Sequence, residues 1–288
     1  MSGKLGSHRA ILACLMTAAI IGATAAGQTE NQPLPGPYLV LYAFDAEGDR
    51  LTRQMKVVDS LKVLGRTVYT GQLAGKQIVL AESGVGMTNA AMSTQALIDC
   101  FCPRAIIFTG IAGAIDTAVH IGDIAICRQW RTHDYGYHGA KGFEVIGLDV
   151  YNPAADTIIE IKDFLVDNIL FTAAEKLAGQ TLGFDSVGSR APRLHIGGVG
   201  VSGNCFIDNR EKRLWLSEQF RALVTDMESA AVAQTALVNG IPFIVFRSAS
   251  DLAGGSGSET AGPELDRFFK VAADNSSRVV MAFLAELK

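Results

Sequence analysis

The sequence predicts one α/β domain with parallel strands in its sheet. Its 288 residues are 49% hydrophobic and 19% charged, so the chain can bury a large core, and one domain is the default at this size. Apolar runs of strand length alternate with segments whose apolar residues keep helical spacing. Several of these runs end directly in acidic, hydroxyl or glycine residues. Because ligands of open α/β sheets bind beside the carboxyl ends of strands, we expect a ligand site built from strand ends.

Residues 224–251 hold the densest set of candidate functional side chains. Asp226 and Glu228 precede an alanine-rich segment of helical spacing that an Asn-Gly pair ends. The apolar run 243–246 follows and reads as a buried strand that delivers Asp251 beyond its carboxyl end. Each acid also has a structural alternative, because carboxylates stabilise helix N-termini and cap turns.

Residues 1–26 differ in kind from the rest of the chain. Lys4 and Arg9 precede the uncharged run 10–26, which contains the small-residue sequence Ala-Thr-Ala at 23–25. This pattern is typical of a secretory signal peptide with its cleavage site. The apolar core is too short to span a bilayer, so we expect cleavage rather than anchoring, and an exported protein that is periplasmic or secreted.

The charge balance argues against a nucleic-acid partner. Removal of Lys4 and Arg9 with the signal leaves 23 basic and 29 acidic residues, a formal charge of −6. Such a surface repels a polyanion. We expect no membrane contact after cleavage, a flexible leader at residues 27–37, and one domain at residues 38–288.

The cysteines and histidines predict neither a metal site nor a disulfide framework. Cys100, Cys102, Cys127 and Cys205 remain after the signal is removed, and four cysteines permit disulfides without requiring them. We expect buried thiols. Because no HxxxH or CxxC pair occurs, we expect no metal and no other cofactor.

Two turns between a strand and a helix add candidate residues. The apolar strand 38–44 runs into Asp45 and Glu47, before a segment of helical periodicity at 51–64. Asp45 could instead serve as an N-cap. A Ser-Gly-Val-Gly turn that begins at Ser83 offers a hydroxyl and backbone N–H groups to an anion, a water or a sugar hydroxyl, although any tight turn would use its glycines.

The remaining segments are read mainly from apolar spacing. We expect a hairpin of strands 67–73 and 76–81, helices at 88–100, 210–220 and 262–288, and strands at 103–108, 121–126 and 195–201. The small residues 109–114 would let backbone approach a flat ligand closely. Within the less readable region 129–192, residues 155–177 show helical repeats. Phe206, after a Ser-Gly turn, could stack on a base or fill the core.

Several motifs together are more informative than any one of them. They are SGVGMTNAA at 83–91, TGIAGAI and IGDIAI within 109–126, VSGNCFI at 201–207, DMESAAVA at 226–233 and SASD at 248–251. In this order the motifs resemble the nucleoside phosphorylase and nucleosidase superfamily, and within it most closely the methylthioadenosine/S-adenosylhomocysteine nucleosidases. The resemblance covers residues 38–126 and 196–287.

The resemblance implies a fold, a reaction and two catalytic residues. The fold would be a three-layer αβα arrangement with a central mixed sheet, of the phosphorylase/hydrolase type, usually in a homodimer. The ligand would be a purine nucleoside. Asp251, with Ser250 beside it, would protonate N7 of the leaving purine, and Glu47, with Ser83 near it, would orient or deprotonate the attacking water.

The resemblance also assigns the substrate-binding residues. Met227 and Glu228 would bind the ribose, with the carboxylate accepting hydrogen bonds from its hydroxyls. Phe206 would stack on the base and the Ile207 backbone would read its edge. Cleavage of an N-glycosidic bond places positive charge on the sugar and negative charge on the base, so an acid on one side and an anionic group on the other suit the reaction.

Phe108 and Glu47 favour water over phosphate as the nucleophile. Phosphorylases of this superfamily typically carry arginine at the position of Phe108, and a phosphate nucleophile normally needs cationic clamps. Asp226 stands where the nucleosidases usually have glutamate, and Gly48 where a larger residue is common. These departures leave the favoured 5′ substituent open.

Two alternatives remain. The chain could be a phosphate-dependent purine nucleoside phosphorylase on the same fold, or a non-catalytic exported protein that binds or stores nucleosides. Retention of both Glu47 and Asp251 argues against the second, because a binding protein needs no acid paired with a water-activating base.

Overall fold

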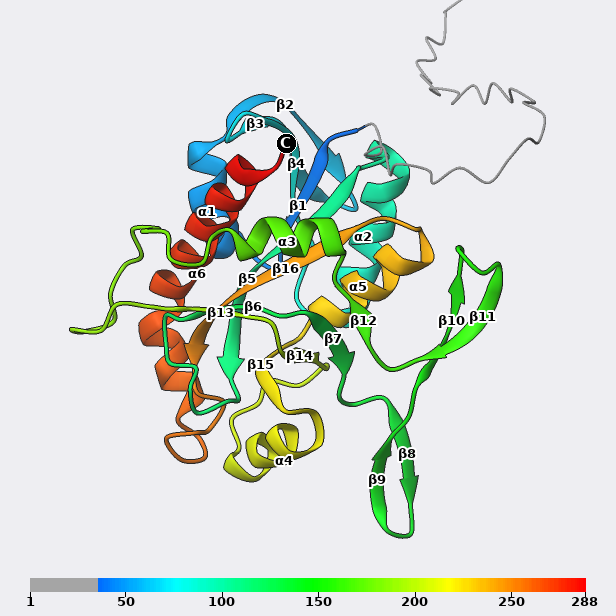
Figure 1. Cartoon of the computed structure of the whole chain (residues 1–288), viewed down its shortest axis with the longest axis vertical. Coiled ribbons are helices and arrows are strands. Elements are labelled where there is room, and N and C mark those ends of the chain that lie inside the picture. The colour runs from blue at the N-terminus through cyan, green and yellow to red at the C-terminus, as the bar shows by residue number, and fades with distance from the viewer. Residues whose placement is uncertain (1–35) are drawn as a thin grey trace, which may run out of the picture. The chain divides into compact units, whose positions relative to one another are not determined.

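The computed structural model describes residues 36–288, which form a mixed sheet with helices on both faces (Figure 1). The predicted signal peptide, and the predicted leader up to residue 35, lie outside the described residues. The main sheet has the order β12-β7-β14-β15-β5-β1-β4-β3-β2. Three further strands extend from β5: β16 pairs with β5, β6 pairs with β16, and β13 pairs with β6. β1 and β16 run parallel to β5, whereas β15 runs antiparallel to it, so the predicted mixed sheet is confirmed.

The strands of this sheet have the following bounds: β1 Tyr38–Tyr42, β2 Lys56–Val63, β3 Arg66–Leu73, β4 Lys76–Glu82, β5 Ala105–Ala114, β6 Ile124–Ile126, β7 Gln129–Thr132, β12 Phe164–Leu165, β13 Leu194–Ile196, β14 Val199–Ser202, β15 Ala222–Asp226 and β16 Phe243–Asp251. Two further hairpins project from the sheet (Figure 1): β8 Gly136–Gly139 with β9 Gly142–Val145, and β10 Leu148–Asn152 with β11 Thr157–Ile161.

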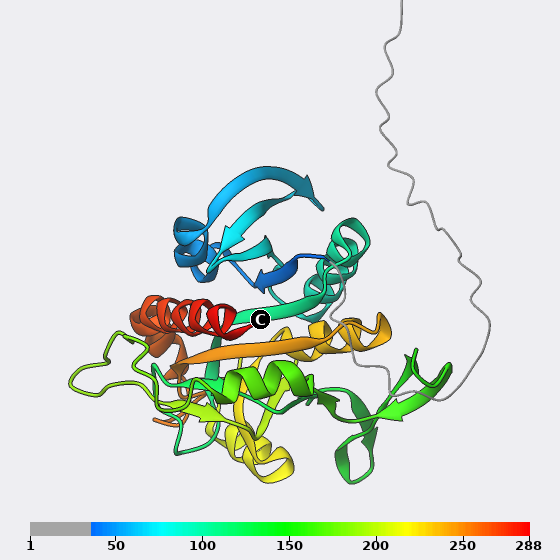
Figure 2. The same cartoon turned by 45° about the horizontal axis from the view of Figure 1, so that its top comes forward.

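The helices form the outer layers (Figure 2). They are α1 Asp45–Gln54, α2 Met87–Phe101, α3 Asn168–Glu175, α4 Arg210–Phe220, α5 Ser229–Val238 and α6 Ala261–Glu286. α6 packs on β16, β5 and α1, while α2 packs on α5. Within residues 36–288, no helix is both long enough and apolar enough to cross a membrane.

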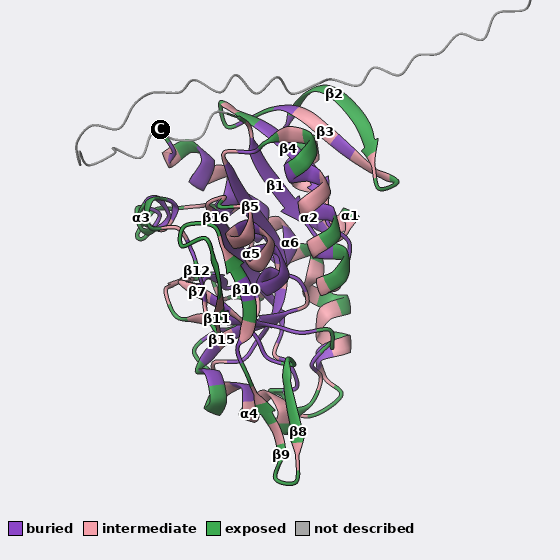
Figure 3. Ribbon diagram, turned by 90° about the vertical axis from the view of Figure 1, so that its right-hand side faces the viewer, coloured by how far each residue is buried: buried purple, intermediate pink, exposed green. Residues whose placement is uncertain are grey.

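β1, β5 and β16 lie at the centre of the buried core (Figure 3). Every residue of β16 is buried, and β5 has one residue that is only partly buried. Strands covered on both faces read as continuous apolar runs, which is why the sequence reveals them clearly. Phe246 of β16 packs against Phe283 of α6 with ring centroids 4.9 Å apart. The last residue of this buried strand is Asp251, so the packed core fixes the position of Asp251.

Several predicted elements have the expected type and nearly the expected bounds. The hairpin of 67–73 and 76–81 is β3 with β4, and the helices predicted at 88–100, 210–220 and 262–288 are α2, α4 and α6. The predicted strand 38–44 contains β1, and the predicted strand 121–126 contains β6. The predicted strand 103–108 covers the beginning of β5.

The prediction of a helix over residues 51–64 was wrong beyond Gln54. Residues 56–63 form β2, an edge strand that is exposed along almost its whole length. Val57, Val58 and Leu61 are exposed, so this strand has no buried face to impose a period of two on its sequence. Its stability comes from the ladder of hydrogen bonds to β3, which spacing alone cannot reveal.

Three other expectations also need correction. The strand predicted at 103–108 continues through residues 109–114 as β5. Residues 155–161 lie in the β10–β11 hairpin, so the helical repeats of 155–177 give a helix only from Asn168. The predicted strand 195–201 is divided between β13 and β14, because Gly197 and Gly198 both have positive φ.

The expectation of buried thiols was wrong for three cysteines. Cys127 is buried, but Cys100, Cys102 and Cys205 are exposed, and all four are free thiols. Cys205 faces the pocket described below.

Candidate active site

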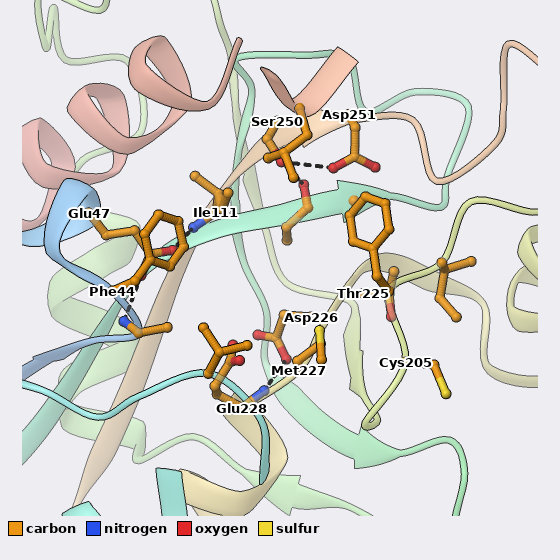
Figure 4. Close-up of a pocket in the computed structure, with 17 residues that line it drawn as sticks. Phe44, Glu47, Ile111, Cys205, Thr225, Asp226, Met227, Glu228, Ser250 and Asp251 are labelled. Atoms are coloured by element: carbon orange, nitrogen blue, oxygen red, sulfur yellow. Dashed lines mark hydrogen bonds between the residues drawn. The ribbon is translucent and has the colours of Figure 1, made fainter. Parts of the chain in front are cut away.

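One pocket of about 250 Å³ lies where β1, β5, β15 and β16 end (Figure 4). Seven of the eight predicted site residues line it: Glu47, Phe206, Ile207, Met227, Glu228, Ser250 and Asp251. The sequence therefore identified most of the side chains that the fold brings together. Apolar residues that the sequence did not single out complete the wall: Phe44, Val85, Ile111 and Leu265.

Ser83 is the predicted site residue that does not line the pocket. It is fully buried, and its hydroxyl donates to the carbonyl of Gly84 at 3.2 Å. Its backbone N–H donates to Tyr42, and its carbonyl accepts from Ser93. Ser83 thus connects β1 to α2 through hydrogen bonds. Val85, two residues later in the same turn, lines the pocket.

Glu47 lies in the first turn of α1 with its carboxylate held by two backbone donors. Oε2 accepts from the N–H of Ala43 at 2.6 Å, and Oε1 accepts from the N–H of Ile111 at 2.8 Å. The residue is 2% exposed. Burial raises the pKa of this carboxyl, an effect that Arg247 and the two N–H groups oppose. Glu47 is therefore fixed in orientation and able to accept a proton.

Asp251, the last residue of β16, lies on a different side of the pocket (Figure 4). Ser250 Oγ donates to Oδ2 at 2.8 Å, and the N–H of Ala253 donates to Oδ1 at 2.9 Å. Burial raises the pKa of the Asp251 carboxyl to about 6, although both hydrogen bonds lower it. A carboxyl with this pKa can hold a proton close to neutral pH and donate it to a ligand.

An irregularity in β16 brings Asp251 to the pocket. The register with β5 shifts between Ala249 and Asp251, and Asp251 comes to lie opposite Gly113. Bulges often redirect side chains at active sites. A Cβ on Gly113 would lie 2.9 Å from the Asp251 carboxylate, so the small residue makes room for the acid.

Arg247 is the main functional residue that the sequence analysis missed. It is fully buried within β16, where its Nε donates to Asp226 Oδ2 at 2.7 Å and its Nη2 donates to Glu228 Oε2 at 3.3 Å. Its Nη1 lies 3.8 Å from Glu47 Oε1. One guanidinium thus faces three carboxylates. The available sequence signal was a charged residue directly after a buried apolar run.

The residues around Arg247 are shaped to accept it. The guanidinium carbon lies 4.1 Å from the centre of the Phe108 ring, a favourable position for a cation over an aromatic face. A Cβ on Gly110 would lie 2.2 Å from Arg247 and 2.3 Å from Glu47. The small residues of β5 thus make room for these charged side chains as well as for Asp251.

Asp226 and Glu228 have separate tasks. Asp226 accepts from Ser202 Oγ at 2.5 Å and from the N–H of Ser229 at 3.1 Å, so it caps α5 and anchors β14. Glu228 accepts from the N–H of Gly86 at 2.9 Å. Burial raises its pKa to about 7, although Arg247 lowers it. Glu228 is therefore the freer of the two carboxylates toward a ligand.

Phe206 is 48% exposed and lines the pocket, which excludes the alternative of a core residue. A half-exposed aromatic ring at a pocket wall can stack on a flat ligand.

Gly48, which follows Glu47, packs closely against Tyr42. A Cβ on Gly48 would lie 2.4 Å from the tyrosine ring. The space that a larger residue after Glu47 would need is filled by Tyr42.

The fold and the site together define an α/β protein with a small pocket at its strand ends, lined by acids, an aromatic ring and aliphatic side chains. A family model described as the phosphorylase superfamily matches residues 37–285, and the chain belongs to this superfamily. It is 32% identical over 254 residues to the 5′-methylthioadenosine/S-adenosylhomocysteine nucleosidase of Halalkalibacterium halodurans, with 86% of this chain and 97% of the relative covered.

Solved structures of nucleosidases with this name have the same fold. The enzyme of Neisseria meningitidis, in complex with methylthio-immucillin-A, matches with a TM-score of 0.71 and 30% identity over 87% of this chain and 99% of that chain. The enzyme of Colwellia psychrerythraea, in complex with adenine, matches with a TM-score of 0.73 and 28% identity over 88% and 97%. The resemblance seen in the motifs is therefore confirmed along the domain.

Replacement of Arg247 by methionine should strongly destabilise the protein. Three buried carboxylates would lose their cation, and removal of one partner of a buried ion pair typically costs about 3–5 kcal/mol. The loss in the free energy of unfolding, measured in urea, should be larger at pH 8 than at pH 5, because the carboxylates can take up protons at the lower pH.

Arg53→Met is the matched control, since Arg53 pairs with Asp49 on the surface of α1 with both side chains more than half exposed. Such pairs contribute about 0–1 kcal/mol. A loss for Arg247→Met no larger than that of the control would contradict the account of this cluster.

Proposed function

We propose that the protein hydrolyses the N-glycosidic bond of a purine nucleoside of the methylthioadenosine/S-adenosylhomocysteine type, giving free base and sugar. The observation that carries this proposal is the pair of buried carboxyl groups, Glu47 and Asp251, on different sides of one pocket (Figure 4). Nucleosidases that match this chain over most of their length support it.

The chemistry assigns a different task to each carboxyl group. Asp251 donates its proton to N7 of the purine, which neutralises the charge that the leaving base develops. The sugar becomes cationic as the bond breaks, and Glu228 accepts hydrogen bonds from its hydroxyls. Glu47 orients a water on the other side of the sugar and takes a proton from it. Phe206 stacks on the base, and the buried Ile207 supplies its backbone.

The lining of the pocket favours water as the nucleophile. Among the described residues, four acids line it and neither arginine nor lysine does: Glu47, Asp226, Glu228 and Asp251. Arg247 lies behind the carboxylates and is engaged by them. A phosphate dianion would meet like charges without a cationic clamp, which disfavours phosphorolysis.

The apolar part of the wall suits a thioether at the 5′ position. Phe44, Val85, Ile111 and Leu265 contribute carbon surface to the same pocket. A methylthio group gains from contact with such surface, whereas a charged 5′ group would lose its hydration. Within the proposed class, this surface favours methylthioadenosine over S-adenosylhomocysteine, whose 5′ substituent ends in a charged amino acid.

Asp251→Asn and Glu47→Gln should each remove most turnover without unfolding the protein. Loss of a positioned acid or base typically lowers the rate by about 10²–10⁴-fold. The measurement is free-base release from methylthioadenosine in phosphate-free buffer, with Asp266→Asn as the control, because Asp266 is an exposed carboxylate of α6. Strict dependence on phosphate would instead establish a phosphorylase.

The same assay has a pH signature. The pKa of Asp251 is raised to about 6, and the acid form is the active one. The value of kcat/KM should therefore fall as the pH rises above about 6, approaching a tenfold loss per pH unit. If the wild-type protein binds nucleoside but releases no base at any pH, a storage or binding protein is the better description.

We also propose that the protein is exported after cleavage of residues 1–26 and acts as a homodimer outside the cytoplasm. The signal-like sequence supports export. Exposed apolar side chains on the two projecting hairpins, among them Tyr137 and Ile158, support burial against a second copy.

Native mass spectrometry of protein purified from the culture tests both points in one spectrum. The expected ion is a dimer of chains that begin close to residue 27. A monomer would contradict the proposed assembly, and a chain that retains its first residues would contradict cleavage.

A further inference from the structure

Asp208 follows the predicted base-contacting residues Phe206 and Ile207, and its side chain binds the start of α6. Oδ1 accepts from the N–H of Thr260 at 2.8 Å and from that of Ala261 at 2.8 Å, while Oδ2 accepts from the N–H of Gly262 at 3.1 Å. The Asp208 carbonyl accepts from Glu259 N–H at 3.2 Å. One residue thus satisfies three of the free donors at the helix N-terminus.

This cap joins two distant segments of the chain. Most N-caps are supplied by the residue that precedes the helix, but the Thr260 hydroxyl donates to Gly257 and does not cap α6. Asp208 lies 52 residues before Thr260. The interaction therefore fixes the loop that carries Phe206 to the helix, in addition to capping the helix N-terminus.

The first turn of α6 also holds the segment after Asp251. Glu264 Oε2 accepts from the N–H of Leu252 at 2.8 Å, and Glu264 Oε1 accepts from Ser256 Oγ at 2.8 Å. The next residue, Leu265, lines the pocket. The loop with the stacking ring and the loop with the general acid are therefore bound to the same helical turn.

Further along, α6 reaches the water-activating side of the site. Ser277 Oγ donates to the carbonyl of Glu47 at 3.3 Å, and Ser276 Oγ donates to the carbonyl of Phe246 at 3.1 Å. A helix is stiff over this length, so the position of its first turn is coupled to the residues that it braces. At the other end of this helix, Asp208 connects the Phe206 loop to it through the backbone N–H groups of residues 260–262.

We propose that Asp208 is a positioning residue that, by capping α6, holds the purine-stacking loop in place relative to the general acid. This inference rests on the proposed function, because it assigns the purine to that side of the pocket. The charge of Asp208 has a second consequence, since Glu264 and Asp208 both raise the pKa of Asp251.

Asp208→Ala and Asp208→Asn separate the two effects. The alanine variant loses all three bonds, and we expect KM for methylthioadenosine and the Kd for adenine each to rise about tenfold, in line with the loss of a strong helix cap. The asparagine variant keeps an oxygen at Oδ1 and should recover most of this binding. Because it lacks the charge, the alkaline limb of its kcat/KM profile should move to lower pH.

Asp167→Ala is the matched control. Asp167 also caps a helix, since its Oδ1 accepts from the N–H groups of Ile169 and Leu170 at the start of α3, but it does not line the pocket. A purely structural role predicts that the variants of Asp208 and Asp167 lower the melting temperature alike and leave KM, the Kd for adenine and the pH profile unchanged. That result would overturn the proposal.

The assay also separates this proposal from the proposed function. A wild-type protein that releases no base contradicts the proposed function, and calorimetry with adenine then tests Asp208 without turnover. A wild-type protein that is active, with an Asp208→Ala variant of unchanged KM and Kd, contradicts the positioning role alone. If the alanine variant fails to fold, the asparagine variant still tests the positioning role, because it loses the acceptor for Gly262 N–H and should raise KM and the Kd for adenine by a smaller factor. Unchanged values of both would overturn the proposal.

Discussion

The site depends on the burial of one cation, the Arg247 guanidinium, among the carboxylates of Glu47, Asp226 and Glu228. Charges removed from water are costly unless they are paired and hydrogen-bonded. Here the helix α1, the end of β15 and the start of α5 each present a carboxylate to the same guanidinium. The elements around the pocket are therefore held by a shared electrostatic requirement as well as by the apolar core.

This arrangement divides the acids of the pocket into two groups. The three that face Arg247 gain from a cation, which opposes the effect of burial on the pKa values of Glu47 and Glu228. Asp251 is held by Ser250 and by a backbone N–H, and burial dominates its pKa. The division lies in their partners and not in the direction of the pKa shift, because burial also raises the pKa of Glu228, to about 7. In the proposed hydrolysis Asp251 donates a proton to the base, while the acids that share Arg247 face the sugar and the water.

The sequence predicted the fold class and most of the site because the relevant signals are local. Strands buried on both faces read as apolar runs, and Asp251 and Glu47 lie within five residues of the ends of such runs. The misses have physical causes. Arg247 looks like a polar strand end until packing buries it, and Ser83 lies in a recognisable motif although its hydroxyl turns toward the backbone. The exposed strand β2 has no buried face that would reveal it.

The central claim is that burial raises the pKa of the Asp251 carboxyl well above the ordinary value for aspartate, away from the cation that the other acids share. Carboxyl ¹³C NMR of the protein, with Asp251→Asn to assign the resonance, measures this directly. The account predicts that the Asp251 signal titrates with a pKa of about 6. A titration close to 4, the ordinary value for aspartate, would contradict the role of Asp251 as the general acid.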